Sequence, residues 1–192
     1  SIKNEPAFTV SVEAEELVYK YEPPDNGSGP MWCHGNTCIV RFGNQLVASG
    51  METLEDEVPY HNTRWTLFKR KAGRWELIVK DEQDRTREPS PLGLLFEKGQ
   101  ILLSVNPTLT ERGVRNGPAE PRILQFDTEN MQKGYETLIP SWEGKPKFTE
   151  HSYRTFVVDG GEDEFILFQN TGYDEAEWVF YDRNGVLNSQ GQ

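Results

Sequence analysis

Residues 37–81 read TCIVRFGNQLVASGMETLEDEVPYHNTRWTLFKRKAGRWELIVKD and contain the pattern that decides the fold. One pair of short apolar segments flanks Gly43-Asn44, and a second pair flanks Lys71-Ala72-Gly73. Tight turns of this composition between segments of high β propensity are typical of antiparallel hairpins. The stretch therefore predicts four antiparallel strands, at residues 37–42, 45–50, 63–70 and 74–81.

The same order of short turn, long connection and short turn recurs twice more along the chain. In the second unit we expect strands at residues 92–97, 101–106, 121–127 and 135–139. In the third unit we expect them at residues 154–159, 164–169 and 177–182, with the chain stopping as a fourth should begin. The turn residues Gly43, Gly99 and Gly160 lie 56 and 61 residues apart, close to the period of large propeller blades.

The predicted fold is all-β: a β-propeller of four-stranded antiparallel blades, with about two and a half blades present. A β-sandwich, which also gives many short strands with regular turns, is the alternative. The expected parts are N-terminal strands at 8–12 and 17–21 with a Pro/Gly-rich loop at 23–30, and blades at 31–85, 86–148 and 149–192. Because a closed ring needs at least four blades, a second chain or further blades would complete it.

Charge and hydropathy limit the kinds of partner. With 20 Lys and Arg against 31 Asp and Glu, the net charge of −11 leaves no broad cationic surface for nucleic acid or an anionic membrane. No apolar run approaches the roughly 20 residues that span a bilayer, and residues 1–6 have no targeting pattern. We therefore expect neither nucleic acid nor membrane as a partner, in a protein that is cytoplasmic or has lost its signal.

The sequence also carries no motif for a cofactor or a metal. It contains no Gly-rich phosphate loop, no Gly-x-Ser-x-Gly elbow and no twelve-residue calcium loop. Its two cysteines, Cys33 and Cys38, are too few for a zinc site and are expected as two thiols or one local disulfide. No cofactor and no metal are expected.

The segment Phe68-Lys69-Arg70-Lys71-Ala72-Gly73-Arg74-Trp75, in which a third strand ends in a turn and a Trp opens the fourth, resembles the BNR-repeat, sialidase-like superfamily of β-propellers. The resemblance covers most of residues 32–185. It implies a glycan-handling propeller, since hydrolases, lyases and lectins are all known on such scaffolds. It also implies a secreted or periplasmic protein.

A candidate site follows from the position of polar residues before the first strand of each blade. In a propeller the first strands line the central channel, so these residues gather at one mouth of it. Nine residues before the three turn glycines lie His34, Ser90 and His151, and seven before lie Asn36, Leu92 and Tyr153. Their charged neighbours in sequence are Arg87, Glu88, Glu150 and Arg154. We expect an axial pocket there.

These side chains allow two kinds of catalysis on a sugar. His34, Glu88, Glu150, His151 and Tyr153 are the candidate acids, bases or nucleophiles. Glu88 and Glu150 could act as the carboxyl pair of a glycoside hydrolase, which is the favoured reading. Alternatively, the histidines and Tyr153 could move a proton in a polysaccharide lyase acting on uronates. The candidate substrate-binding residues are Asn36, His61, Arg64, Arg87 and Arg154.

Two other classes of function compete with catalysis. In a non-catalytic glycan-binding propeller, exposed aromatic residues such as Trp32 and Trp142 would stack on sugar rings. In a scaffold, the edges of the blades would bind another protein. The sequence leaves hydrolase, lyase, lectin and scaffold open.

Overall fold

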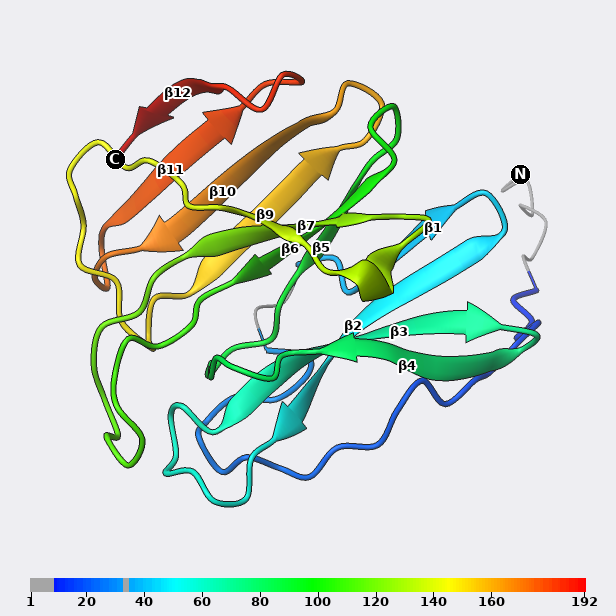
Figure 1. The fold of residues 1–192 in the computed structure, drawn as a ribbon, viewed down its shortest axis with the longest axis horizontal. Coiled ribbons are helices and arrows are strands. Elements are labelled where there is room, and N and C mark those ends of the chain that lie inside the picture. The colour runs from blue at the N-terminus through cyan, green and yellow to red at the C-terminus, as the bar shows by residue number, and fades with distance from the viewer. Residues whose placement is uncertain (1–8, 33–34) are drawn as a thin grey trace, which may run out of the picture.

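The computed structural model describes residues 9–32 and 35–192, and within these residues the protein is all-β, with three four-stranded antiparallel sheets and a single short 3-10 turn (Figure 1). The prediction of an all-β chain of repeated four-stranded units is therefore confirmed. No helix in the described part of the chain is long and apolar enough to cross a membrane.

The first sheet is formed by the stretch that opened the sequence analysis. Its strands are β1 (Ile39–Phe42), β2 (Gln45–Thr53), β3 (Thr63–Lys71) and β4 (Arg74–Lys80), and each pairs with the next. The turn between β3 and β4 has positive φ at both Ala72 (50°) and Gly73 (77°), the type I′ geometry that matches the twist of a hairpin.

The second and third sheets repeat this order. The second contains β5 (Leu92–Leu95), β6 (Gln100–Val105), β7 (Arg122–Asp127) and β8 (Glu136–Leu138), with the 3-10 turn η1 (Met131–Lys133) before β8. The third contains β9 (Arg154–Asp159), β10 (Glu164–Asn170), β11 (Ala176–Tyr181) and β12 (Leu187–Gly191). The prediction of an incomplete third unit is wrong, because β12 supplies its fourth strand.

The N-terminal strands are also corrected. Phe8 lies outside the described residues, and residues 9–23 contain no strand. They run as an extended segment along the first sheet, where the Tyr19 ring stacks on Phe68 at 5.0 Å between centroids. Glu16 pairs with Arg70 and accepts a hydrogen bond from the indole of Trp75 at 3.0 Å. The segment covers the sheet by side-chain contacts rather than by joining its ladder.

The three sheets lie side by side through their first strands, with β1 against β5 and β5 against β9 (Figure 1). One apolar core lies between the first two sheets and contains Trp65, Leu67, Ile101 and Phe126. A second core lies between the second and third sheets. Because side chains alternate between the faces of a strand, the second sheet is buried on both faces.

Side chains in the second core include Leu102, Ile123, Phe156, Leu167 and Val179. Burying each such side chain contributes about 1.5–3 kcal/mol, so the two cores together hold the three sheets in this order. The close approach of β5 to β9 depends on Gly93, since a Cβ there would lie 2.0 Å from a methyl carbon of Val158.

Candidate functional site

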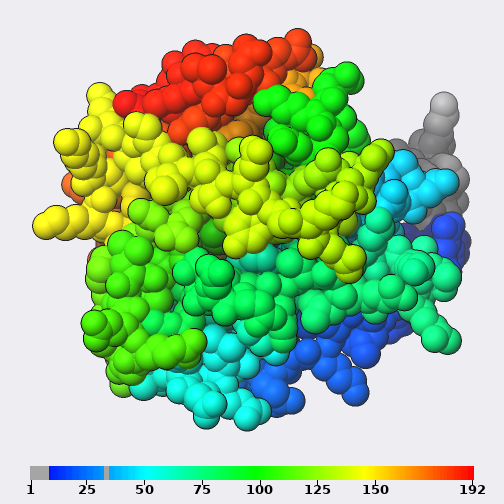
Figure 2. Space-filling model, in the orientation of Figure 1, coloured from blue at the N-terminus to red at the C-terminus, as the bar shows by residue number. Residues whose placement is uncertain are grey.

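Polar side chains are concentrated where four connecting segments meet at one end of the sheets. These segments are residues 54–62, 81–91, 106–121 and 139–153, and single β-bridges join Thr63 to Thr86 and Pro118 to Thr149. Figure 2 shows segment 106–121 (green) next to segment 54–62 (cyan) at the lower left of the molecule. We call Tyr60, His61, Arg87, Arg115, Glu150 and His151 the polar cluster.

His151 is the most accessible histidine among the described residues and is held between two charged groups. Its Nδ1 is hydrogen-bonded to Arg87, and its Nε2 lies 3.5 Å from Oε1 of Glu150. A guanidinium can only donate, so Nδ1 accepts and the ring proton sits on Nε2. Partial burial and the Arg87 charge lower the pKa of His151, while Glu150 opposes them. The ring is therefore neutral at neutral pH.

The two carboxyl groups proposed as a catalytic pair are both covered by protein. The side chain of Glu150 is 3% exposed and that of Glu88 is 1% exposed. Glu150 accepts a hydrogen bond from the backbone N–H of Gly117 at 3.1 Å, and Glu88 lies 3.6 Å from Nε of Arg87. The structure thus brings Arg87, Glu88, Glu150 and His151 to one end of the molecule, with both carboxyls facing protein groups.

His61, expected to bind substrate, is part of the same cluster but is fully buried. Its Nε2 lies 3.3 Å from the hydroxyl of Thr108. Burial lowers the pKa of His61, and Glu150 raises it by a smaller amount. His61 therefore acts as a neutral internal contact between segments 54–62 and 106–121.

Tyr60 and Arg115 were not identified from the sequence. Tyr60 has a φ of 86°, a backbone conformation that costs a bulky residue about 1–3 kcal/mol. The guanidinium groups of Arg87 and Arg115 lie over its ring, 5.0 and 4.9 Å from the ring centroid, and the His151 ring is 5.4 Å away. The only sequence signal was the pair of arginines in the 106–121 connection of an acidic chain.

A nearby loop holds Arg87 in place. Its Nε donates to the backbone oxygen of Asn26 at 2.9 Å, and its own carbonyl accepts from the hydroxyl of Ser28 at 2.7 Å. Gly27 (φ 79°) lies so close that a Cβ there would be 3.0 Å from a guanidinium nitrogen. The Pro/Gly-rich loop at 23–30 therefore orients one member of the polar cluster.

The other predicted site residues lie outside the polar cluster, and two of them, Asn36 and Arg154, line a pocket together with Trp32 and Tyr153. The side chain of Asn36 bridges the Arg154 carbonyl (3.1 Å) and the Phe156 N–H (2.9 Å), so it ties the chain before β1 to β9. Arg154 is buried and donates to the carbonyls of Pro89 (2.6 Å) and Ser104 (3.3 Å). Arg64 pairs with Glu52 and Glu82 on the first sheet, outside the polar cluster. His34 lies outside the described residues.

A groove lined by exposed aromatic side chains begins beside His151. One part, of about 300 Å³, is lined by seven residues, among them the predicted site residues Asn36, Tyr153 and Arg154 and the aromatic residues Trp32 and Phe168, with Asn170. A second part, also about 300 Å³, shares Tyr153 and Asn170 and extends to His151 and Tyr173. The rings of Trp32 and Tyr153 lie 6.0 Å apart. We call these two parts together the aromatic groove.

Trp142, the second tryptophan proposed to stack on sugars, lies elsewhere and packs edge-on against Phe148 at 4.8 Å. Cys38 has a half-buried free thiol whose burial raises its pKa, and Cys33 lies outside the described residues. Neither Trp142 nor Cys38 lines the aromatic groove.

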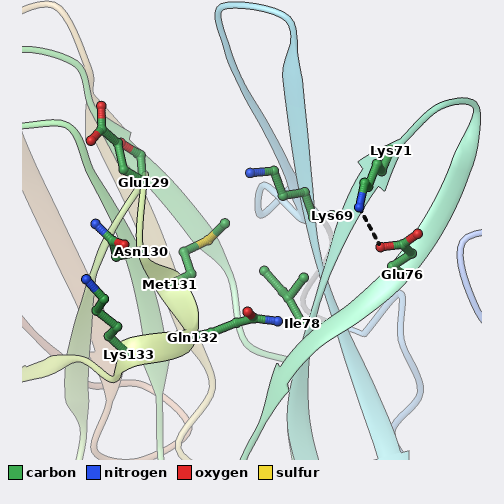
Figure 3. A pocket seen from close by; sticks show the side chains of 10 residues that line it. Lys69, Lys71, Glu76, Ile78, Glu129, Asn130, Met131, Gln132 and Lys133 are labelled. Atoms are coloured by element: carbon green, nitrogen blue, oxygen red, sulfur yellow. Dashed lines mark ion pairs between the residues drawn. The ribbon is translucent and has the colours of Figure 1, made fainter.

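A larger hollow of about 390 Å³ lies between the β3–β4 hairpin and η1, away from the polar cluster (Figure 3). Lys69, Lys71 and Lys133 line it together with acidic Glu76 and Glu129, and Lys71 lies 4.0 Å from Glu76. Its charges are mixed, and the aromatic rings seen in the groove are absent from its lining. We therefore take the polar cluster and the aromatic groove as the candidate functional site.

Comparison with known proteins identifies no relative: no protein-family model matches the chain, and no curated protein matches it. The function is therefore inferred from the residues of the polar cluster and the aromatic groove.

Proposed function

We propose that this protein is a glycan-binding β-propeller that holds a sugar chain in the aromatic groove without cleaving it. The observation that carries the proposal is that Trp32, Tyr153 and Phe168, all exposed, line one groove together with Asn170. Aromatic rings offer flat apolar faces at low entropic cost, and sugar rings have apolar faces of matching size. Asn170 adds an amide able to bind hydroxyl groups.

The arrangement of the sheets supports the propeller. Three sheets stand side by side with their first strands adjacent, and the middle sheet is covered on both faces. A sandwich has only two sheets facing each other, whereas propeller blades follow one another around an axis. The polar cluster and the Tyr153 end of the groove lie where the first strands begin, and Phe168 of β10 extends the groove along the outer face of the third sheet.

The state of the titratable groups supports binding over catalysis. A general acid or base must reach the substrate with a free proton site. Both ring nitrogens of His151 face protein groups, Arg87 on one side and Glu150 on the other. The carboxyls of Glu88 and Glu150 are almost fully covered. The two carboxyls are covered by protein, and each nitrogen of the half-exposed His151 ring lies beside a charged protein group.

Hydrolysis is the second candidate, and one observation favours it. Glu150 lies directly behind His151, which lines the groove. If a bound sugar displaced the His151 ring, the carboxyl would reach the ligand, as the sequence-based prediction of a glycoside hydrolase requires. Elimination by a lyase would need Tyr153 to transfer a proton, and its ring is exposed in the groove.

Calorimetric titration with a panel of neutral and acidic oligosaccharides tests the binding proposal. We expect W32A and Y153A each to weaken binding at least about tenfold, since a lost aromatic anchor costs about 1.4 kcal/mol or more. The matched control is F96A, which removes an exposed aromatic ring from the turn at the opposite end of β5. Equal effects of all three changes, or no binding by the wild-type chain, would overturn the proposal.

Product analysis on the same panel across pH separates binding from catalysis. We expect no turnover at any pH. Turnover that the E150Q change abolishes would overturn the non-catalytic assignment and support the hydrolase.

A further inference from the structure

An exposed arginine near the His151 end of the aromatic groove indicates which glycans the groove accepts. We propose that Arg115, stacked on Tyr60, is a recognition site for the carboxylate of an acidic sugar, so that the ligand is a uronate-containing glycan. This inference rests on the proposed glycan-binding function and adds the ligand class to it.

Arg115 differs from its arginine neighbours Arg85, Arg87 and Arg112 in having no carboxylate partner among the described residues. Arg85 and Arg112 both pair with Glu57, and Arg87 lies 3.6 Å from Glu88. Among residues 9–32 and 35–192, Arg115 makes no ion pair, and its side chain is exposed. On a chain with a net charge of −11, an exposed guanidinium without a carboxylate is well suited to bind an acidic ligand.

Tyr60 fixes the position of this guanidinium. The guanidinium carbon of Arg115 lies over the Tyr60 ring, 4.9 Å from the ring centroid. The guanidinium carbon of Arg87 lies 5.0 Å from the same centroid. Stacking on an aromatic face leaves the edge of a guanidinium, which carries its N–H donors, free to bind a carboxylate in a bidentate manner. The left-handed backbone of Tyr60 (φ 86°) is the strained feature that places the ring there.

The recognition site adjoins the groove through His151. The Tyr60 ring is 5.4 Å from the His151 ring, and His151 lines the part of the groove that contains Tyr153 and Tyr173. The buried acid of the polar cluster, Glu150, is 3% exposed and accepts a hydrogen bond from the backbone N–H of Gly117. Its charge is therefore directed into the protein, and a sugar chain stacked in the groove can extend its carboxylate toward Arg115.

The test compares each uronate oligosaccharide with its own carboxyl-reduced form, which has the same sugars and linkages without the charge. Tetragalacturonate and tetramannuronate are the probes, titrated by calorimetry into the wild-type chain and into R115Q. We expect R115Q to weaken binding of the bound uronate about tenfold, to the level of the reduced form. Binding of the reduced form should be the same in wild type and R115Q.

The matched control is R112Q, on the same connection. It removes the same charge from an exposed side chain, but one that pairs with Glu57. If R112Q and R115Q weaken uronate binding equally, the effect is net charge alone and the inference fails. If wild type binds charged and reduced forms equally well and R115Q changes neither, the inference fails while the glycan-binding function stands. If the chain binds neither form nor any sugar of the wider panel, the proposed function itself fails.

Discussion

His61 and His151 make the stability of the folded chain depend on pH. Burial lowers the pKa of both imidazoles below the ordinary value of 6.5, so the unfolded chain takes up a proton more readily than the folded one. The free energy of unfolding is therefore greatest well above pH 6.5, where neither state binds the proton, and it falls as the pH drops through 6.5. We expect a decline between pH 7.5 and 5.5, of at most about 1.4 kcal/mol per pH unit for each proton.

Urea unfolding followed by tryptophan fluorescence measures this decline. H61Q, which keeps a hydrogen-bonding group beside Thr108 but cannot titrate, should show a shallower decline than wild type. H151Q should have the smaller effect, because the His151 side chain is 50% exposed. A decline as steep in H61Q as in wild type would show that other groups control this pH range.

Single residues of the site differed in how well the sequence predicted their positions. The distance of nine residues from a turn glycine identified His151, and its neighbours Glu150, Arg87 and Glu88 do lie at the same end of the sheets. Tyr60 could not be predicted in this way. Its place depends on a left-handed backbone angle and on packing against two arginines, and neither leaves a periodic pattern in the sequence.

At the scale of elements, one buried acid, Glu57, ties the 54–62 connection to the 81–91 and 106–121 connections. Glu57 pairs with Arg85 at 2.9 Å, where both side chains are buried, and also with the exposed Arg112. We expect E57A to destabilise the fold by about 3–5 kcal/mol, because it leaves the Arg85 charge buried without a partner. R112A should cost no more than about 1 kcal/mol. Denaturant titration measures the free energy of unfolding of both variants. Similar losses of stability in E57A and R112A would contradict the prediction that the buried Arg85 pair matters more than the exposed Arg112 pair.

The N-terminal segment depends on Gly50 in β2. A Cβ at this position would lie 2.8 Å from Cε1 of Tyr19 and 2.9 Å from Cε2 of Phe68. G50A should therefore displace Tyr19 and cost about 1–3 kcal/mol, as overpacking usually does. The freed segment should be cut faster by trypsin after Lys20. G172A is the control, because a Cβ there meets nothing within 4 Å, and equal cleavage of both variants would refute the idea.

The sequence predicted the strands that lie between tight turns. It missed β12, which forms without an apolar pattern in its sequence. β12 reads LNSQG and has one neighbour, β11, so it requires few apolar side chains. The opposite error occurred at residues 8–12. There Val10 and Val12 alternate as in a strand, yet they are 92% and 80% exposed, because alternation alone does not supply a partner strand.

For the whole molecule, the outer face of the third sheet differs from the faces inside. Val157, Ile166 and Phe180 stand directly opposite one another across β9, β10 and β11 on this face. Ile166 is the third residue of the second strand of its sheet. The residue at the same place in the second sheet, Leu102, is fully buried against the third sheet. The third sheet thus has an apolar face of the kind that the second sheet buries, but Val157 is 54% exposed.

An apolar sheet face of this kind favours association. We expect the chain to self-associate in a concentration-dependent manner, measured by sedimentation velocity, because two such faces can bury each other. V157K places a charge in the middle of the face and should shift the equilibrium to the monomer. V186K adds the same charge at a 58% exposed position in the turn before β12 and should leave association unchanged. A wild-type chain that stays monomeric at every concentration would contradict the prediction, because the apolar face would then remain exposed to water without driving association.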